Sequence, residues 1–543
     1  MHHAYEQHFP FSTIRQEQKD AIQFALDAFI EQGKRFVVLE MGTGCGKSAT
    51  GITIARYLQA LHESGNRSVP TGGSYIITTQ KVLQEQYVRD FGNDRGILKP
   101  IRSASSYTCQ FFEQHDYDVS CAEIRRLLKS KAKCNFIYDA CNTTCKFQKA
   151  REQFVQGVEG ITNYAYFLTS TTYAYDIDRR GLIVIDEGHN IEGALSNFVR
   201  IAFSNFFYKH ILNVKTPGIN ASSATVFRWL IETCSPKLRQ VIRERKKLQV
   251  DSSDSQEAIT AARELEQLER NLKKIEHFAE VYDPSTWVLD VSKSDKRGER
   301  IYEFKPVDVT QYARDLLFSQ TDRVLILSAT ILDRDVFCAS VGIPLDQVAY
   351  LRIPSPFPIS NRPVHFVPAG SMSKANIDST LPVLSEVVKM LLEQHPNEKG
   401  IIHCGTYKIA KYLFENVGNK RLLTHTSDDR DAVIQMHCSS ELPTVLLSPS
   451  MMEGVDLADD LSRFQILCKI PFPYLGDTAV LKQMERNKDW YGYQTVKSVV
   501  QSLGRSIRNE TDHAISYILD SDWKRFYMNN SRMFPEEFAL SLS

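Results

Sequence analysis

The sequence lacks a net charge, because its 65 lysine and arginine residues are balanced by 65 aspartate and glutamate residues. The overall charge therefore does not indicate a nucleic-acid-binding protein, and any DNA site must come from local patches. The chain also lacks an apolar run of roughly 20 residues, which a membrane helix needs, and its first residues, MHHAYEQHF, lack a signal-peptide core. We therefore expect a soluble, cytoplasmic protein of several domains without membrane contacts.

Cysteine is sparse except in one short segment. Five of the eleven cysteines fall between Cys109 and Cys145, and in a reducing compartment such clustering favours a metal site over disulfides. Zinc ligands usually lie two to four residues apart, which only Cys141 and Cys145 nearly satisfy, whereas wide spacing suits an iron–sulfur cluster held by four thiolates. Basic and aromatic residues also alternate between Glu123 and Lys149, which suits single-strand binding, although a solvated helix face would explain the charges alone.

A strict phosphate-loop pattern is absent, because Met41 occupies the position of its first glycine. The segment Arg35 to Ser48, RFVVLEMGTGCGKS, still has an apolar strand, glycines, Gly-Lys-Ser and a helix start in the required order, which a plain glycine-rich turn would not need. Lys47 would contact the β and γ phosphates of ATP, and the Ser48 hydroxyl would bind Mg²⁺. The predicted nucleotide-binding residues of this loop are Gly42, Thr43, Gly44, Gly46, Lys47 and Ser48.

The flanks of this loop predict further contacts. Apolar residues at helical spacing over 22–29 predict an amphipathic helix that begins near Arg15 and Gln18. A glutamine amide there would read the adenine edge of ATP, and an ordinary surface glutamine is the alternative. After the loop, the run YIITT at 75–79 predicts a strand whose end, with Gln84 of the next helix, suits a nucleic-acid backbone.

An acidic motif follows a second uninterrupted apolar run. Residues 182–185 predict a buried parallel strand, and ligand sites lie at the C-terminal ends of such strands. There Asp186 would bind Mg²⁺, Glu187 would orient and deprotonate the attacking water, and His189 would relay the nucleotide state to the nucleic-acid site. Two acids could instead cap the next helix, but the phosphate loop favours the catalytic interpretation.

The rest of the chain predicts a helical insertion and a second α/β unit. Apolar spacing over 259–278 predicts a long amphipathic helix opposite an earlier one, whose basic cluster at 239–247 suits either nucleic acid or a solvated face. WVLDV and RIYEFKPV predict a hairpin, and VLILSAT at 324–330 predicts a buried strand. Without a second phosphate loop, further strand candidates alternate with helices at 400–407, 444–450 and 464–472.

This second unit contains candidates for completing the nucleotide site. MMEGVDL includes Gly454 and Asp456, and QSLGRSIRNETD includes Gln501, Arg505 and Arg508. The two arginines would project from neighbouring positions of one helix face, as arginine fingers supplied across a cleft do. A surface helix is the alternative for this segment taken alone.

Taken in order, EMGTGCGKS, TTQKVLQEQ, DEGH, LILSAT, MMEGVDL and QSLGRSIR resemble the motifs of superfamily-two helicases of the XPD and DinG branch. SYTC, SCAEIRR, KCNFIYDA and CKFQKAR resemble the ligand neighbourhoods of the XPD iron–sulfur domain. The sequence departs from the family at Gly188, where the family usually has alanine, and in an insertion that is short for the branch. The resemblance implies a [4Fe-4S] cluster bound by Cys109, Cys121, Cys134 and Cys145, with Cys141 as the alternative to Cys134.

The resemblance also implies an α/β fold with two RecA-like parallel-sheet motor domains, and with an iron–sulfur domain and a helical arch inserted in the first. The expected boundaries are 1–105, 150–205 and 301–345 for the first motor domain, 106–149 for the iron–sulfur domain, 206–300 for the arch and 346–543 for the second motor domain. The implied activity is ATP-driven 5′ to 3′ translocation by a monomer on single-stranded DNA, with unwinding of forked or tailed duplexes. A translocase or remodelling ATPase on DNA or RNA without unwinding, and a clamp switched by ATP, are the alternatives.

Overall fold

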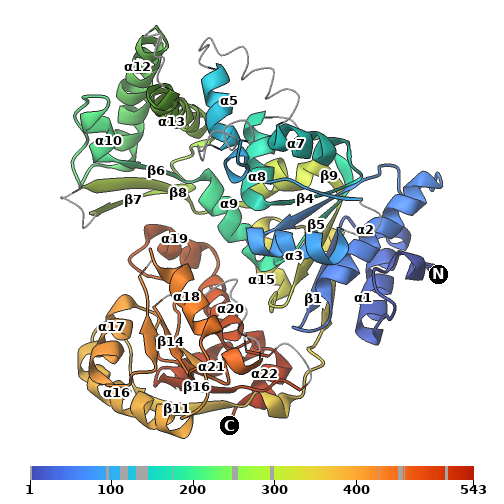
Figure 1. The fold of residues 1–543 in the computed structure, drawn as a ribbon, viewed down its shortest axis with the longest axis vertical. Helices are drawn as coiled ribbons and strands as arrows, with labels where there is room; N and C mark the ends of the chain where they lie inside the picture. The colour runs from blue at the N-terminus through green and yellow to red at the C-terminus, as the bar shows by residue number, and fades with distance from the viewer. Residues whose placement is uncertain are drawn as a thin grey trace.

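The computed structural model describes residues 3–543 with the exception of 93–96, 110–119, 130–144, 175–176, 248–254, 294–298, 427, 450–456, 458, 505 and 508–510. The described chain is α/β and is built on two parallel sheets (Figure 1), as the sequence predicted. We call the seven-stranded sheet with its helices the first unit and the six-stranded sheet with its helices the second unit. None of the described helices has both the length and the apolar character of a membrane span.

The first unit has the strand order β10-β1-β9-β5-β2-β4-β3, and all its strands are parallel. Its strands are β1 (Phe36–Met41), β2 (Ser74–Thr78), β3 (Leu98–Pro100), β4 (Glu159–Asn163), β5 (Arg180–Ile185), β9 (Thr321–Ser328) and β10 (Val348–Ile353). Successive residues of β1 pack on opposite faces, Phe36 and Val38 in one apolar core and Val37 and Leu39 in another. Both faces are therefore covered, which explains the uninterrupted apolar runs at 36–39 in β1, 182–185 in β5 and 324–327 in β9.

Helices of the first unit follow the strands and cover both faces of the sheet. They are α1 (Gln16–Leu26), α2 (Lys47–Glu63), α3 (Lys81–Phe91), α7 (Lys146–Gln156), α8 (Tyr164–Thr169), α9 (Ile191–Val199), α14 (Thr310–Tyr312) and α15 (Arg334–Val341), with α5 (Cys121–Lys129) in the cysteine segment. The predicted amphipathic helix before the phosphate loop is α1, and α2 begins at Lys47 as expected.

One strand contradicts an expected boundary. β10 pairs in parallel with β1, from Phe36 opposite Val348 to Met41 opposite Ile353. The expected start of the second motor domain at residue 346 therefore falls inside the first sheet. β10 covers the outer edge of β1, which would otherwise expose unpaired backbone groups. Its residues, VAYLRI, mix apolar and charged side chains, so no uninterrupted apolar run marked it in the sequence.

The region between α9 and β9 carries a small antiparallel sheet and a group of helices. The sheet has the order β6-β8-β7, and its β7–β8 pair is the predicted hairpin. The elements are β6 (Ile201–Ser204), α10 (Asn205–His210), α11 (Ser223–Arg228), α12 (Ser235–Lys247), α13 (Ser255–Val281), β7 (Trp287–Lys293) and β8 (Arg300–Pro306). α13 is the predicted long helix, and its Leu268, Ile275 and Phe278 are buried.

The second unit has the strand order β11-β16-β15-β12-β14-β13. Its strands are β11 (Val364–Gly370), β12 (Gly400–His403), β13 (Leu422–Thr424), β14 (Val445–Ser448), β15 (Phe464–Leu467) and β16 (Ile515–Asp520). Its helices are α16 (Ile377–Gln394), α17 (Tyr407–Asn416), α18 (Arg430–Ser439), α19 (Thr478–Arg486), α20 (Trp490–Leu503), α21 (Trp523–Asn530) and α22 (Glu536–Ser541). In Figure 1, α19 and α20 lie at the end of this unit that faces α9.

Candidate active site

The phosphate loop joins β1 to α2 at the C-terminal edge of the first sheet. Gly44 and Gly46 have φ values of 88° and 75°, which glycine adopts without strain. A Cβ atom on Gly46 would lie 2.1 Å from Nε2 of Gln18, and one on Gly44 would lie 2.1 Å from the ring of Phe357. Both glycines are therefore required by backbone conformation and by close packing. The first N–H groups of α2 point toward the loop, where they favour an anion.

The predicted nucleotide-reading residues lie at this loop. The backbone N–H of Arg15 donates to Oε1 of Gln18 at 3.0 Å, and Nε2 of Gln18 lies against Gly46. Gln18 is only 4% exposed, so the alternative of an ordinary surface glutamine is wrong. Lys47 donates from Nζ to the Met41 carbonyl oxygen at 3.4 Å, which keeps its ammonium over the loop.

The acid pair directly follows β5, two strands from β1. Asp186 is buried, and burial together with the neighbouring Glu187 carboxylate raises the pKa of Asp186 to about 6, while Lys47 opposes this shift. A desolvated carboxylate beside a second one is stabilised by a cation, so the residues fit Mg²⁺. Glu187 has a φ of 51°, a left-handed conformation that is strained for a non-glycine residue and is common at functional sites.

Two buried tyrosines that the sequence analysis missed face the acid pair. The hydroxyls of Tyr87 on α3 and Tyr164 on α8 are buried without a hydrogen-bond partner. Burial raises the pKa of both, and the Asp186 carboxylate raises it further. The Tyr87 hydroxyl also lies next to the Ser48 side chain. An unpartnered hydroxyl between the two proposed Mg²⁺ ligands is a group that a hydrated cation would satisfy.

His189 connects the acid motif to the strand β9. Its Nδ1 lies 2.9 Å from the Ser328 hydroxyl, which places DEGH and LILSAT in contact. Two residues beyond Ser328, the Thr330 hydroxyl accepts a hydrogen bond from Nε2 of Gln501 on α20 at 2.9 Å. The structure therefore places Gln501 against the segment that follows β9, next to the acid motif. Gly454, Asp456, Arg505 and Arg508 lie outside the described residues. The expectation that one helix carries Gln501 and both arginines is wrong, because α20 ends at Leu503 and the described residues Ser506 and Ile507 are not helical.

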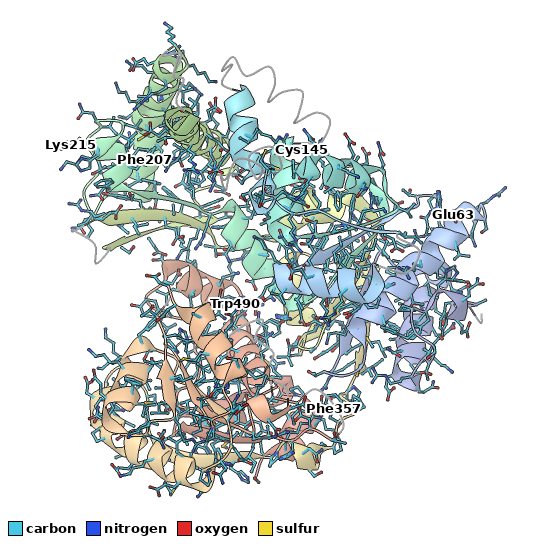
Figure 2. The ribbon with its side chains drawn as sticks, viewed as in Figure 1. Glu63, Cys145, Phe207, Lys215, Phe357 and Trp490 are labelled. Atoms are coloured by element: carbon cyan, nitrogen blue, oxygen red, sulfur yellow. The ribbon has the colours of Figure 1, made fainter. Side chains whose placement is uncertain are left out.

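A linker between the units also touches the phosphate loop. The Ser355 hydroxyl donates to the Thr43 carbonyl oxygen at 2.9 Å, and the Cys45 thiol donates to the Pro354 carbonyl oxygen at 3.4 Å. Phe357, labelled in Figure 2, packs with Ile507 of the second unit. The linker therefore contacts both the loop and the segment that carries Arg505 and Arg508 in the sequence. No motif predicted this contact.

Three of the four proposed cluster ligands, Cys109, Cys121 and Cys145, lie among the described residues of the cysteine segment. Sγ of Cys145 (Figure 2) lies 3.9 Å from Sγ of Cys121, and Cys109 and Cys121 are buried in the same apolar core. Burial and the neighbouring Cys145 raise the pKa of Cys121 to about 12, so Cys121 is a neutral thiol unless a metal binds it. Among the described residues, no three His, Cys, Asp or Glu side chains form a metal-binding group. Cys134 and its alternative Cys141 lie outside those residues.

Two other polar features have structural roles. Gln84 is fully buried, and its amide donates to the carbonyl oxygens of Ile101 and Ile161, so the expected contact of Gln84 with a nucleic-acid backbone is wrong.

In the basic cluster at 239–247, Arg239 and Lys246 form ion pairs with α13 at 2.7 and 2.6 Å, which favours the solvated-face interpretation. α13 also contacts the cysteine segment, because Nε of Arg263 donates to Glu123 at 2.7 Å.

Comparisons with known proteins agree with this site. The family described as "Helicase C-terminal domain" matches residues 389–539, and the one described as "Type III restriction enzyme, res subunit" matches residues 11–225. The ATP-dependent DNA helicase DinG of Photobacterium profundum is 27% identical over 42% of this chain and 35% of its own length. The ATP-dependent DNA helicase YoaA of Escherichia coli is 22% identical over 40% of this chain and 36% of its own length. The chain thus spans about a third of the length of these two relatives.

Solved structures share the fold along nearly the whole chain. A structure titled "XPD_Helicase" has a TM-score of 0.63 at 14% identity and covers 96% of this chain and 98% of its own. Xpd4 of S. tokodaii has a TM-score of 0.56 at 15% identity, with 97% and 99% covered. The two parallel sheets are therefore those of RecA-like domains. In its two family matches, its helicase relatives and its fold, the chain is similar to superfamily-two helicases of the XPD and DinG type.

Proposed function

We propose that the protein is an ATP-hydrolysing motor that translocates on single-stranded DNA and unwinds forked or tailed duplexes. The observation that carries this proposal is the convergence of the phosphate loop, the acid pair and Gln501 of the second unit at one sheet edge. Hydrolysis at such a site changes contacts between two units, and alternating closure and opening can move a strand.

In the proposed reaction, Lys47 and the loop N–H groups hold the phosphates of ATP. Ser48 and Asp186 hold Mg²⁺, which when bound neutralises charge on the phosphate oxygens. Glu187, whose own backbone is left-handed, orients the attacking water and accepts its proton, and its Oε2 lies 3.3 Å from Nδ1 of His189. Gln18 and Arg15 select the base, and Gly454, Asp456, Arg505 and Arg508 complete the site from the second unit.

We further propose that Cys109, Cys121, Cys134 and Cys145 hold a [4Fe-4S] cluster. The close approach of Cys121 and Cys145 and the soft sulfur donors support a thiolate-bound metal centre. The cluster would make the cysteine segment rigid, and the α5–α13 contact would join it to the helical insertion. Such a rigid element would act as the wedge at a DNA fork.

Strand displacement on matched DNA and RNA duplexes, each with a 5′ or a 3′ single-stranded tail, tests the function. We expect ATP-dependent displacement of 5′-tailed DNA by a monomeric protein, with polarity resting on the family resemblance alone. ATP hydrolysis stimulated by single strands without any displacement would instead indicate the translocase or remodelling ATPase. Binding of ATP without hydrolysis would indicate a clamp and would overturn the proposal.

A further inference from the structure

A carboxylate of the first unit is held by side chains of the second. Glu192 lies in the first turn of α9, directly after the DEGH motif. Its Oε1 accepts hydrogen bonds from Nε1 of Trp490 at 2.9 Å and from Nε2 of Gln483 at 3.2 Å. Its Oε2 accepts a third hydrogen bond from Nε2 of Gln494 at 2.8 Å. We call these four residues the Glu192 clasp, and Figure 2 labels Trp490 at this junction.

The donors of the clasp are neutral, and the surrounding charge suits a carboxylate. Trp490 is 9% exposed, and Glu192, Gln483 and Gln494 are half-buried, so the hydrogen bonds are partly shielded from water. Burial raises the pKa of Glu192, whereas Lys497, one turn beyond Gln494 on α20, and the three hydrogen bonds oppose this shift. Lys497 also donates to the His189 carbonyl oxygen at 3.4 Å. Hydrogen bonds to an ionised acceptor are shorter and stronger than neutral ones, and low local dielectric strengthens them further.

The clasp fixes one end of α20, and a second contact fixes the other. Trp490 is the first residue of α20, whereas Gln501, near its end, donates to Thr330 at 2.9 Å. At 1.5 Å per residue these contacts are about 16 Å apart, so together they set both the position and the direction of the helix. In the sequence, Arg505 and Arg508 follow Leu503, the last residue of α20, by about two and five positions.

The clasp also lies close in sequence to the proposed catalytic residues, so a structural change at the nucleotide site can shift the Glu192 carboxylate. Glu187, the proposed base, and His189 belong to the short turn that leads directly into α9, and Glu192 lies in the first turn of that helix. A shift of DEGH therefore moves the Glu192 carboxylate relative to its three donors. A simple structural contact between units would not need to follow the catalytic motif so closely.

We propose that Glu192 is a positioning residue that docks α20 on the first unit and so sets when the residues after α20 can complete the nucleotide site. The inference rests on the proposed function, because it gives α20 the task of delivering Arg505 and Arg508. Through the Glu192 carboxylate, the position of the acid motif is coupled to the position of the second unit.

Three variants test the clasp. Glu192→Ala removes the acceptor, and Trp490→Phe keeps the buried ring but removes its N–H donor. Glu232→Ala, at an exposed glutamate of the helical insertion, is the matched control. We expect Glu192→Ala to lower kcat for DNA-stimulated ATP hydrolysis about tenfold, the effect of losing hydrogen bonds to a charged group. ATP affinity should stay within twofold, and Glu232→Ala should behave as the wild type.

The double variant separates positioning from general destabilisation. If the clasp acts as a unit, Glu192→Ala with Trp490→Phe should be no slower than Glu192→Ala alone, because the interaction has already been lost. Hydrogen exchange provides a direct measure of docking: amides of α20 should exchange faster in Glu192→Ala, while those of α16 should not change.

Two results would overturn the inference. One is unchanged exchange in α20 of Glu192→Ala. The other is a wild-type kcat in that variant despite faster exchange, which would leave docking without a catalytic role. A wild-type protein that does not hydrolyse ATP would refute the proposed function instead, and the exchange experiment would still decide whether Glu192 docks α20.

Discussion

At the scale of single residues, ATP binding and ATP hydrolysis should be separable by mutation. Glu187→Gln should still bind ATP but lose turnover by roughly 10²–10⁴-fold, because orienting and deprotonating water is a transition-state task. Lys47→Ala should weaken both, since its ammonium contacts the phosphates before reaction. Nucleotide binding and phosphate release in the presence of single-stranded DNA measure the two effects. Near wild-type hydrolysis by Glu187→Gln would show that another residue is the base.

The pKa of Asp186 predicts a pH limit on Mg²⁺ binding. Burial raises this pKa to about 6, so the carboxylate becomes protonated as the pH falls through 6 and can no longer bind the cation. Because the folded pKa is raised, the stabilisation from this group is complete below the ordinary aspartate pKa and is lost as the pH rises through 6. Titration of Mg²⁺-dependent nucleotide binding between pH 5 and 8 tests this expectation. Asp186→Asn should remove the pH dependence, and a flat wild-type profile would contradict the assignment.

The unpartnered Tyr87 hydroxyl should matter only when the site is filled. Tyr87→Phe removes a buried donor that costs roughly 1–3 kcal/mol when unsatisfied, so the free protein should be equally stable or more stable. The Mg²⁺ concentration for half-maximal ATP hydrolysis should rise several-fold. Thermal unfolding and an Mg²⁺ titration measure the two effects. A less stable variant with an unchanged Mg²⁺ requirement would assign Tyr87 to packing alone.

At the scale of elements, uninterrupted apolar runs identified the central strands. β1, β5 and β9 are buried on both faces, so their position and the motifs at their ends could be read directly from the sequence. β10 could not, because its assignment depends on pairing with β1, more than 300 residues away in the chain. Glu192 and Tyr87 escaped notice for the same reason, since their partners lie on other elements and leave no local pattern. Gln84 was misjudged because a polar side chain near a strand end can equally well satisfy buried carbonyl groups.

The cysteine segment should depend on its metal. Cys121 and Cys145 come close, and burial disfavours a thiolate at Cys121, so we expect this thiol to be deprotonated only when the proposed cluster is bound. Anaerobically purified protein should be brown and should contain about four iron and four sulfide ions per chain, as a [4Fe-4S] cluster requires. Cys121→Ser should lose both, whereas Cys234→Ser, at a buried cysteine of the helical insertion, should not. Stoichiometric zinc without iron in this preparation would show that the cysteines bind zinc and not an iron–sulfur cluster.

At the scale of the whole molecule, stepping and strand separation should depend on different parts. The proposed catalytic residues that the structure describes, from Lys47 to Gln501, lie on the two sheets and their helices. The proposed cluster ligands lie in a separate segment, which the Arg263–Glu123 contact joins to α13. Translocation needs only closure and opening of the two units around a strand. Unwinding also needs a rigid element at the fork, since each base-pair step resists opening by about 1.4 kcal/mol.

Cys134→Ser should therefore retain DNA-stimulated ATP hydrolysis and lose displacement of 5′-tailed duplexes. Hydrolysis and displacement measured on the same preparation, with its iron content determined, test this separation, and Cys234→Ser again serves as the control. Loss of hydrolysis together with displacement would mean that the cluster segment supports the motor itself rather than the fork. Normal unwinding by a variant shown to lack its cluster would exclude the cluster as the source of rigidity. The wedge would then have to be sought in α12 and α13, which carry buried apolar side chains in a common core and need no metal to pack.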